Sequence, residues 1–244
     1  MSESILRCTE HATQFLDKLR ILSGGKPVGF KLAIGHVWEW FAIAKAMQQS
    51  QILPDFIVVD GGEGGTGAAP LEFSDHVGMP LREALMIVHQ TLVGLNLRSE
   101  IKIGAAGKII TGFDIARTLA IGADWCNAAR GFMFAVGCLQ SQTCHTGQCP
   151  TGVATQDPSR QKGLDPMDKS DRVYYFQKNT VKALAELLAA AGLKHPEQLG
   201  PEHIIRRVSS VMVLPLSKVY PQLQPGSLLH GEPDHPSLRE YWQE

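Results

Sequence analysis

Short, continuously apolar segments alternate with helical segments through the first half of the chain, and this alternation constrains the fold most strongly. The segments with the length and composition of buried strands are 28–34, 55–60, 101–104 and 123–128. Apolar residues recur at helical spacing in the segments 4–22, 37–49, 81–97 and 112–121. Continuous apolar strands that alternate with helices are typical of a parallel sheet whose outer face is covered. The sequence therefore predicts an α/β fold.

Each predicted strand is followed by a loop rich in glycine, charge or cysteine. Barrels and doubly wound sheets both hold their binding sites at the carboxyl ends of parallel strands. No Gly-x-Gly-x-x-Gly turn joins the first predicted strand to a helix. This favours a (β/α)8 TIM barrel over a doubly wound sheet, and the four β/α units make half of such a barrel.

The chain after the cysteine-rich loop predicts helices and a tail rather than further strands. Helical spacing begins at Ser170, a plausible N-cap, and ends before Gly192, which suits a left-handed C-terminal cap. A shorter helix is predicted to follow Pro201 as far as Val208. Prolines at 215, 221, 225, 233 and 236 indicate an extended tail along the surface. We therefore expect a barrel part over residues 1–157 and a helical C-terminal extension with an extended tail over 158–244.

Composition excludes several classes of protein. The chain has 244 residues, of which 44% are hydrophobic and 19% charged, and its formal net charge is -1. These values are typical of a globular protein and give no sign of a nucleic-acid partner. No window approaches the ~18 uninterrupted apolar residues of a membrane span, and the first residues lack the blocks of a signal peptide. We expect a cytoplasmic protein.

Cys138, Cys144 and Cys149 lie close together in a loop with the spacing C-x5-C-x4-C. Three thiolates around one small volume are what an iron–sulfur cluster with one missing iron corner requires. Zinc held with the help of His145 is one alternative, and plain buried thiols are another. The total of five cysteines is odd, which favours ligands or core thiols over disulfides. Cys8 and Cys126 are predicted to be core thiols.

A lysine and a glycine-rich loop are the other candidates for chemistry. Lys31 interrupts an apolar strand, where an ammonium group without a partner is costly to bury. We expect it to reach the mouth of a barrel or an anion, with extension into solvent as the alternative. The loop 61–67 contains five glycines, which let backbone N–H groups approach a ligand closely. A flexible surface loop is the alternative.

Two motifs carry a resemblance to a known family. One is Asp60-Gly-Gly-Glu-Gly-Gly-Thr-Gly-Ala-Ala-Pro, and the other is Gly137-Cys-x5-Cys-His-Thr-x-x-Cys-Pro-x-Gly-Val-Ala-Thr-Gln. Over about residues 23–157, and more loosely beyond, the chain resembles the FMN-binding glutamate synthase domain. The resemblance implies a (β/α)8 barrel that holds FMN and a [3Fe-4S] cluster. It also implies that the predicted strands are the fifth to eighth, so that the chain holds the C-terminal half of the barrel.

The resemblance implies roles for individual residues. It gives the cluster ligands as Cys138, Cys144 and Cys149, and the catalytic residues as Lys31 and Glu63. Lys31 would lie near the N1–C2 carbonyl edge of the flavin or near the substrate carboxylate. The residues of the flavin and substrate pocket would include Asp60, Gly61, Gly62, Gly64, Gly65, Thr66 and Gly67. The residues around the FMN phosphate would be Gly104, Gly107, Lys108, Ala129 and Arg130, although Lys108 and Arg130 could equally be solvated surface charges.

The activity implied is the reduction of 2-iminoglutarate, formed from 2-oxoglutarate and ammonia, to L-glutamate. An electron donor such as ferredoxin or a reductase subunit is implied as a partner. Glu63 stands where larger glutamate synthases often have histidine or aspartate, so another oxo or hydroxy acid is an alternative substrate. A further alternative is a half-barrel that is inactive until a separate N-terminal half joins it. A structural module stabilised by zinc is the third alternative.

Overall fold

The computed structural model describes residues 3–63, 69–70, 72–230 and 236–242. Its main sheet consists of four parallel strands in the order β1-β2-β3-β4. The strands are β1 (Gly29–Ala33), β2 (Phe56–Asp60), β3 (Lys102–Ala106) and β4 (Trp125–Asn127). The α/β prediction and the parallel sheet are therefore confirmed, whereas the assignment of these strands to one half of a barrel stays a prediction.

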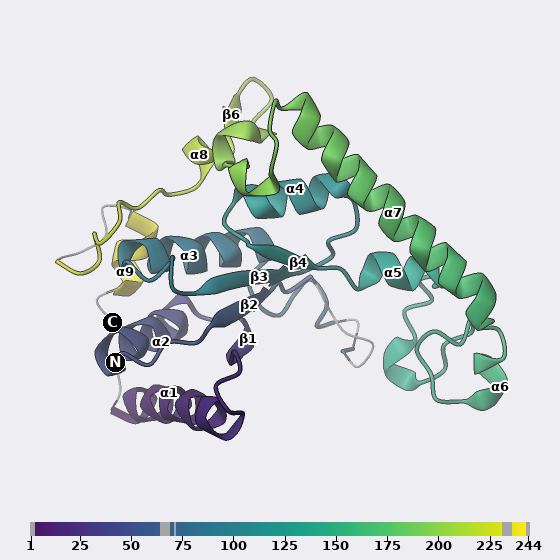
Figure 1. The fold of residues 1–244 in the computed structure, drawn as a ribbon, viewed down its shortest axis with the longest axis horizontal. Helices are drawn as coiled ribbons and strands as arrows, with labels where there is room; N and C mark the ends of the chain where they lie inside the picture. The colour runs from purple at the N-terminus through teal and green to yellow at the C-terminus, as the bar shows by residue number, and fades with distance from the viewer. Residues whose placement is uncertain (1–2, 64–68, 71, 231–235, 243–244) are drawn as a thin grey trace.

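The helices that connect the strands cover one face of this sheet (Figure 1). The helices that alternate with the strands are α1 (Glu3–Leu22), α2 (Val37–Ser50), α3 (Leu81–Gly94) and α4 (Gly112–Ala120). Those that follow β4 are α5 (Arg130–Ala135), α6 (Pro158–Gln161), α7 (Pro166–Ala190), α8 (Leu216–Val219) and α9 (Pro236–Trp242). Helix α1 lies against α2, and α7 runs past α4 and α5. Helix α7 thus packs on the helices that come before and after β4.

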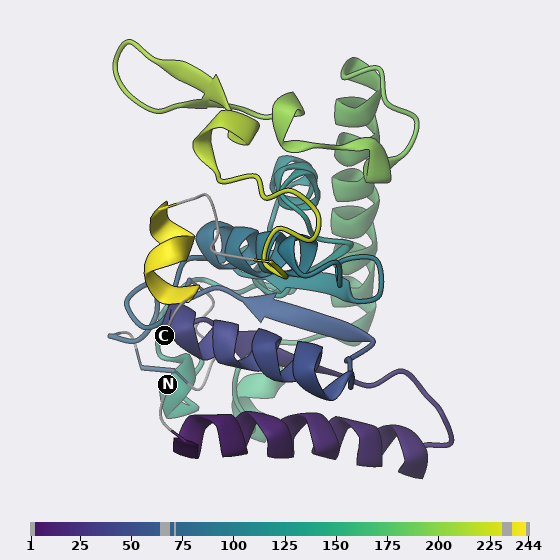
Figure 2. The ribbon, with the colours of Figure 1, turned by 90° about the vertical axis from the view of Figure 1, so that its left-hand side faces the viewer.

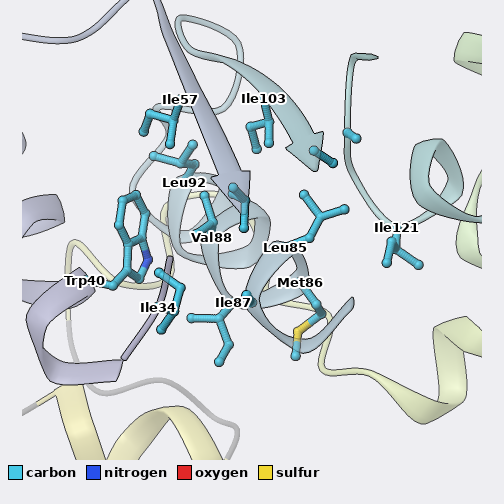
Figure 3. Close-up of a cluster of buried hydrophobic side chains, with 14 of the residues drawn as sticks. Ile34, Trp40, Ile57, Leu85, Met86, Ile87, Val88, Leu92, Ile103 and Ile121 are labelled. Atoms are coloured by element: carbon cyan, nitrogen blue, oxygen red, sulfur yellow. The ribbon is translucent and has the colours of Figure 1, made fainter. Parts of the chain in front are cut away.

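The core lies between the sheet and helices α2 and α3 (Figure 3). Ile57 and Ile103 point from the sheet into this layer and are fully buried, because alternate residues of a strand face opposite sides. Trp40 of α2 is buried beside them, and its Nε1 donates a hydrogen bond of 3.0 Å to Oγ1 of Thr91 in α3. Thr91 in turn donates to the carbonyl of Ile87 at 2.7 Å. This pairing satisfies the indole N–H inside an apolar core.

In the part of the chain that the structure describes, no helix lies across the other face of the sheet. Lys31 and Ala33 of β1 are exposed on it. Phe56 and Trp125, the first residues of β2 and β4, meet there edge to face with ring centroids 6.0 Å apart. Trp125 lies flat across Gly104, where an added Cβ would be 2.5 Å from the indole ring. This face therefore carries a partly buried aromatic pair at one end and an exposed lysine farther along it.

The long helix near the end of the chain begins earlier than the sequence predicted. Asp165, not Ser170, is its N-cap, and the Asp165 carboxylate accepts a hydrogen bond of 3.0 Å from the N–H of Met167. Pro166 occupies the first helical position, where its missing N–H costs nothing. The predicted left-handed conformation of Gly192 is confirmed, with φ of 73°.

The helix predicted after Pro201 is wrong. A 3-10 turn at Pro201–His203 is followed by β5 (Ile205–Arg207), which pairs antiparallel with β6 (Val213–Pro215). The β-branched residues of this segment favour a strand once a second strand lies beside it.

The tail is also less extended than predicted, because α8 and α9 are helical and several of its side chains join the core. These core residues are Leu216, Tyr220, Leu223, Leu228 and Leu238. The boundary at 157 stays a prediction, and Asp157 itself is the N-cap of α6.

Candidate functional site

The carboxyl ends of the four strands bring the predicted site loops to one edge of the sheet. In the register of the sheet, Ala33 lies beside Asp60, Asp60 beside Ala106, and Ala106 beside Asn127. The loops that follow these residues are therefore neighbours, as expected for parallel strands. This edge is the candidate site.

Lys31 forms an ion pair with Asp60 on the open face of the sheet. The distance from Nζ of Lys31 to Oδ2 of Asp60 is 2.5 Å, and the two side chains are 54% and 24% exposed. The predicted anionic partner of Lys31 is thus a carboxylate of the neighbouring strand. Because an ammonium group has three N–H donors, Lys31 can hold Asp60 and still donate to a ligand above the sheet.

The described start of the glycine loop is fixed by backbone hydrogen bonds. Gly61 N–H donates to the Ala106 carbonyl at 2.7 Å, and Gly62 N–H donates to the Met79 carbonyl at 2.9 Å. The Gly62 carbonyl accepts from the N–H of Asp75 at 2.9 Å. Here the loop is therefore an ordered connection between β2, β3 and the approach to α3. The predicted residues Gly64, Gly65, Thr66 and Gly67 lie outside the described residues.

Glu63 holds the start of α3. Both of its carboxylate oxygens lie 3.0 Å from the N–H of Leu81, the first residue of that helix. A carboxylate at a helix N-terminus interacts favourably with the unpaired N–H groups and the helix dipole. The side chain also lies across Gly61, where an added Cβ would overlap Oε2, and close to Gly107. These contacts show that Glu63 positions the start of α3, and the catalytic role that the resemblance implied for it stays a prediction.

Lys108 is tied to a residue that the sequence did not single out. Its Nζ lies 2.7 and 2.6 Å from the two carboxylate oxygens of Asp75. Gly107 and Lys108 both have positive φ, at 156° and 46°. Asp75 lies in a loop with no periodic pattern, so the sequence holds no signal for this contact. In the structure it has a positive φ of 68°, a conformation that Asp tolerates. An anionic ligand at Lys108 would share this cation with Asp75.

The remaining residues predicted around the FMN phosphate are Gly104, in the middle of β3, and Ala129 and Arg130, which follow β4. Gly104 is buried within β3 beneath Trp125. Ala129 is the N-cap of α5 and Arg130 its first residue. Helix α5 packs tightly on α7, since a Cβ at Gly131 would be 2.7 Å from the ring of Phe176. The long helix therefore determines where α5 and Arg130 lie relative to β4.

The cysteine loop begins where α5 ends. The N–H of Cys138 donates to the Met133 carbonyl at 2.9 Å, and Cys144 opens a 3-10 turn that ends at Gly147 with φ of 72°. Cys149 is buried, with its sulfur 3.5 Å from Oγ1 of Thr151. Among the described residues, no three His, Cys, Asp or Glu side chains are grouped closely enough to hold a metal ion. The ligand set Cys138, Cys144 and Cys149 therefore stays a prediction, as does the zinc alternative with His145.

The surroundings of Cys149 favour its thiolate. Burial raises the pKa of the thiol, but hydrogen bonds from the Thr151 hydroxyl and from the backbone of Ala154, Thr151 and Val153 outweigh burial and lower the pKa to about 7. Donors around a sulfur are the surroundings that a metal-bound thiolate requires. This donor set fits a cluster ligand at Cys149.

The surroundings of Cys126 disfavour its thiolate, in contrast to those of Cys149. Burial first, and the nearby Asp114 second, raise the pKa of its thiol to about 12. Its side chain packs against the core. The prediction of a core thiol is therefore confirmed at Cys126, while the side chain of Cys8 lies outside the described residues.

Comparison with known proteins defines the class to which the chain belongs. A family model described as "Conserved region in glutamate synthase" matches residues 5–194. The chain therefore belongs to the glutamate synthase family. Within the described part of the chain, none of the helices combines the length and hydrophobicity that a membrane-spanning helix requires.

Particular relatives in this family are curated as glutamate synthases or as glutamate synthase-like. The chain is 47% identical over 193 residues to the glutamate synthase large subunit-like protein YerD of Bacillus subtilis, which covers 79% of this chain and 37% of that protein. It is 40% identical over 174 residues to the archaeal glutamate synthase [NADPH] of Methanocaldococcus jannaschii, covering 71% of this chain and 33% of that one. The chain thus spans about a third of the length of these relatives.

A solved structure with a related arrangement is a mutant flavocytochrome b2 with pyruvate bound. It has 14% sequence identity and a TM-score of 0.43, and the match covers 76% of this chain and 36% of that one. A likeness at this level does not identify the barrel class.

Proposed function

We propose that the chain forms part of a glutamate synthase-like oxidoreductase that uses FMN and an iron–sulfur cluster. The reaction is the reduction of 2-iminoglutarate, formed from 2-oxoglutarate and ammonia, to L-glutamate. The observation that supports this best is the carboxyl edge of the sheet, where Lys31 and its partner Asp60 lie beside Gly61 and Gly62, whose N–H groups are held by backbone hydrogen bonds. Membership of the glutamate synthase family agrees with it.

The residues at this edge fit a flavin mononucleotide. Lys31 would hold the carbonyl edge of the isoalloxazine ring or the substrate carboxylate, and Asp60 orients Lys31 through the ion pair. The remaining cofactor residues in the described part are Gly61, Gly62, Gly104, Gly107, Lys108, Ala129 and Arg130. FMN, when bound, would supply hydride transfer to the imine carbon. A positive charge next to the ring stabilises the negative charge of its reduced form.

The cysteine loop would hold the cluster. Cys149 already has a donor set that favours its thiolate, and Cys138 and Cys144 would complete the three ligands. A [3Fe-4S] cluster would supply one-electron transfer between an external donor and the flavin. We propose ferredoxin or a reductase subunit as that donor.

Metal and flavin analysis tests this assignment. Protein purified without oxygen is analysed for iron, sulfide, zinc and FMN, and the oxidised sample is examined by EPR. We expect three irons and one FMN per site, with the signal of a [3Fe-4S] cluster, and loss of iron in Cys144→Ser. Zinc without iron would instead support the structural zinc module, and protein with neither iron nor flavin would reject the proposal for the isolated chain.

Two lysine variants, measured side by side, test the role of Lys31. In protein that binds flavin, Lys31→Met should slow glutamate formation by about 10²-fold, because a preorganised charge next to the reacting ring is removed. Lys102→Met is the matched control, since Lys102 opens β3 at the opposite end of the sheet. Equal rates in the two variants would show that Lys31 acts only as a solvated charge.

A partner-dependent half-barrel is the second candidate, and the open edges of the sheet favour it. In the described structure β1 pairs only with β2, and β4 only with β3. Unpaired parallel edges favour the addition of further strands. Co-expression with an N-terminal barrel half should then raise solubility and flavin content together, and unchanged flavin content would count against this candidate.

A comparison of substrates distinguishes the proposed reaction from that of a flavin enzyme that acts on another oxo or hydroxy acid. Glu63, which stands where larger relatives often have another residue, motivates the comparison. Reduced enzyme is mixed with 2-oxoglutarate and ammonia, or with other acids, and flavin reoxidation is followed in a single turnover. Faster reoxidation by an acid other than 2-oxoglutarate would favour the alternative.

A further inference from the structure

The loops that follow β2 and β3 are joined at the carboxyl edge of the sheet by a backbone hydrogen bond and an ion pair. Gly61 N–H donates to the Ala106 carbonyl at 2.7 Å. Farther from the strands, Asp75 forms an ion pair with Lys108. In Figure 2 both loops leave the sheet on the side toward which the strand arrows point. A carboxylate that the proposed function does not use therefore holds a cation that it assigns to FMN.

The backbone fixes the course of the loop that carries Asp75. Asp75 N–H donates to the Gly62 carbonyl at 2.9 Å, and Asp75 itself has a positive φ of 68°. Gly62 can lie beneath this loop because it has no side chain, since an added Cβ would be 2.6 Å from the carbonyl oxygen of Gly78. The carboxylate thus approaches Lys108 from a segment that is held by its own contacts.

The ion pair leaves part of the lysine free for another ligand. The carboxylate oxygens of Asp75 lie 2.7 and 2.6 Å from Nζ of Lys108. An ammonium group has three N–H donors, so at least one of them can still bind an anion. The side chains of Lys108 and Asp75 are 37% and 51% exposed, so a ligand can reach them. A phosphate group bound there would lie close to the carboxylate, and like charges at that distance repel each other.

The position of Lys108 does not depend on this ion pair. Ile109, the next residue, is 3% exposed and belongs to the core, so the backbone beside Lys108 is anchored from below. An exposed ion pair between flexible side chains contributes little to holding either of them, because solvent screens it. The main effect of Asp75 is therefore on the charge that Lys108 offers to a ligand.

We propose that Asp75 competes with the phosphate group of FMN for Lys108 and thereby lowers the affinity of the chain for FMN. This inference rests on the proposed function, which places that phosphate near Lys108. The carboxylate and the phosphate share one ammonium group, so each weakens the hold of the other. Riboflavin has the same ring and ribityl chain but no phosphate, and it does not enter this competition.

Fluorescence titration of the full chain with FMN and with riboflavin tests the inference. Asp75→Asn keeps the size of the side chain but removes its charge, so it should bind FMN about fivefold more tightly and riboflavin with unchanged affinity. The gain for FMN should shrink at high salt. Glu72→Gln is the matched control, because it removes a carboxylate from an exposed residue three positions earlier. It should change neither affinity.

A double variant distinguishes competition at Lys108 from a general effect of negative charge in the loop. Lys108→Met should weaken the binding of FMN and leave that of riboflavin unchanged. When Asp75→Asn is added to Lys108→Met, its gain for FMN should fall to about twofold or less, because only screened repulsion remains. A full fivefold gain without the lysine would overturn the inference.

Other outcomes separate this inference from the proposed function. An Asp75→Asn variant that binds FMN with equal or lower affinity, or that also gains affinity for riboflavin, would overturn the inference and leave flavin binding intact. If the chain bound neither flavin, the proposed function would fail, and inorganic phosphate would still test Asp75. Phosphate should raise the Tm of Asp75→Asn more than that of the wild type, and an equal rise in both would overturn the inference.

Discussion

At the scale of the residue, His89 shows how a polar group is held inside this fold. Nε of Arg98 donates to Nδ1 of His89 at 3.0 Å, so the ring is held in its neutral form. Burial first, and the charge of Arg98 second, lower the pKa of His89 to about 4 against the opposing effect of Asp124. Protonation would place a second cation beside Arg98.

This arrangement predicts that the protein is less stable in acid. Because the folded pKa lies below the ordinary value of 6.5, the unfolded chain binds the proton first as the pH falls. The contribution of His89 is complete above pH 6.5 and is lost toward pH 4, at a cost of about 3 kcal/mol. Urea unfolding at pH 7 and pH 4.5 measures it. The loss should be smaller in His89→Gln and unchanged in His11→Gln, and equal losses in all three proteins would refute the assignment.

Gly122 gives a second prediction at this scale. It has φ of 118°, and a Cβ there would overlap the ring of His89. Gly192 also has positive φ, at 73°, but nothing lies within 4 Å of its added Cβ. Gly192→Ala should therefore cost about 1 kcal/mol of unfolding free energy for the backbone alone, and Gly122→Ala at least about 2 kcal/mol. Similar losses by chemical denaturation would show that the contact with His89 adds nothing.

At the scale of the element, the sheet is fastened at its amino end by two similar arrangements. Asp55, just before β2, accepts from the N–H of Val28 at 2.7 Å and from Arg20 at 3.0 Å. Asp124, just before β4, accepts from the N–H of Ile103 at 2.7 Å and from Arg98 at 2.8 Å. Each carboxylate joins its strand to the preceding neighbour. An aromatic residue, Phe56 or Trp125, then begins each strand.

The more buried of these two carboxylates should contribute more to the free energy of unfolding. The Asp124 side chain is 26% exposed and that of Asp55 43%. Asp124→Asn leaves Arg98 partly buried without its ion pair and should cost about 2–3 kcal/mol, whereas Asp55→Asn should cost about 1 kcal/mol because solvent screens its pair. Thermal and urea unfolding of both variants measure the difference. A larger loss in Asp55→Asn would contradict this order.

The elements also show what the sequence could predict. Strands β1 to β4 were predicted because continuous apolar residues identify a buried strand without knowledge of its neighbours. The hairpin was not, because Ile204, Ile205 and Val208 fit helical spacing as well as a strand, and pairing with β6 decides between them. For the site, the lysine in an apolar strand predicted that Lys31 would reach an anion or the mouth of a barrel, and its ion pair with Asp60 supplies an anion. The contacts of Glu63 with Leu81 and of Lys108 with Asp75 depend on loop conformation, which has no periodic signal.

At the scale of the whole molecule, one face of the sheet is packed and the other is open. The packed face holds a continuous core from α2 to the C-terminal segment. The open face carries the Phe56 and Trp125 pair and the exposed Lys31. Among the described residues, the free edges of the sheet are at β1 and β4. We infer that strands added between these edges would bury the aromatic pair and enclose the candidate site.

Trp125 should report this closure. The partner is the proposed N-terminal barrel half, expressed as a separate segment. Trp38 and Trp242 are replaced by phenylalanine, and Trp40 remains because it is already buried in the core. Acrylamide quenching of the remaining fluorescence should fall when the segment binds, because the added strands cover the indole ring. In a further variant with Trp125→Phe the change should disappear. A complex that forms while Trp125 stays equally accessible would mean that the segment binds elsewhere and that the open face of the sheet is not the inside of a barrel.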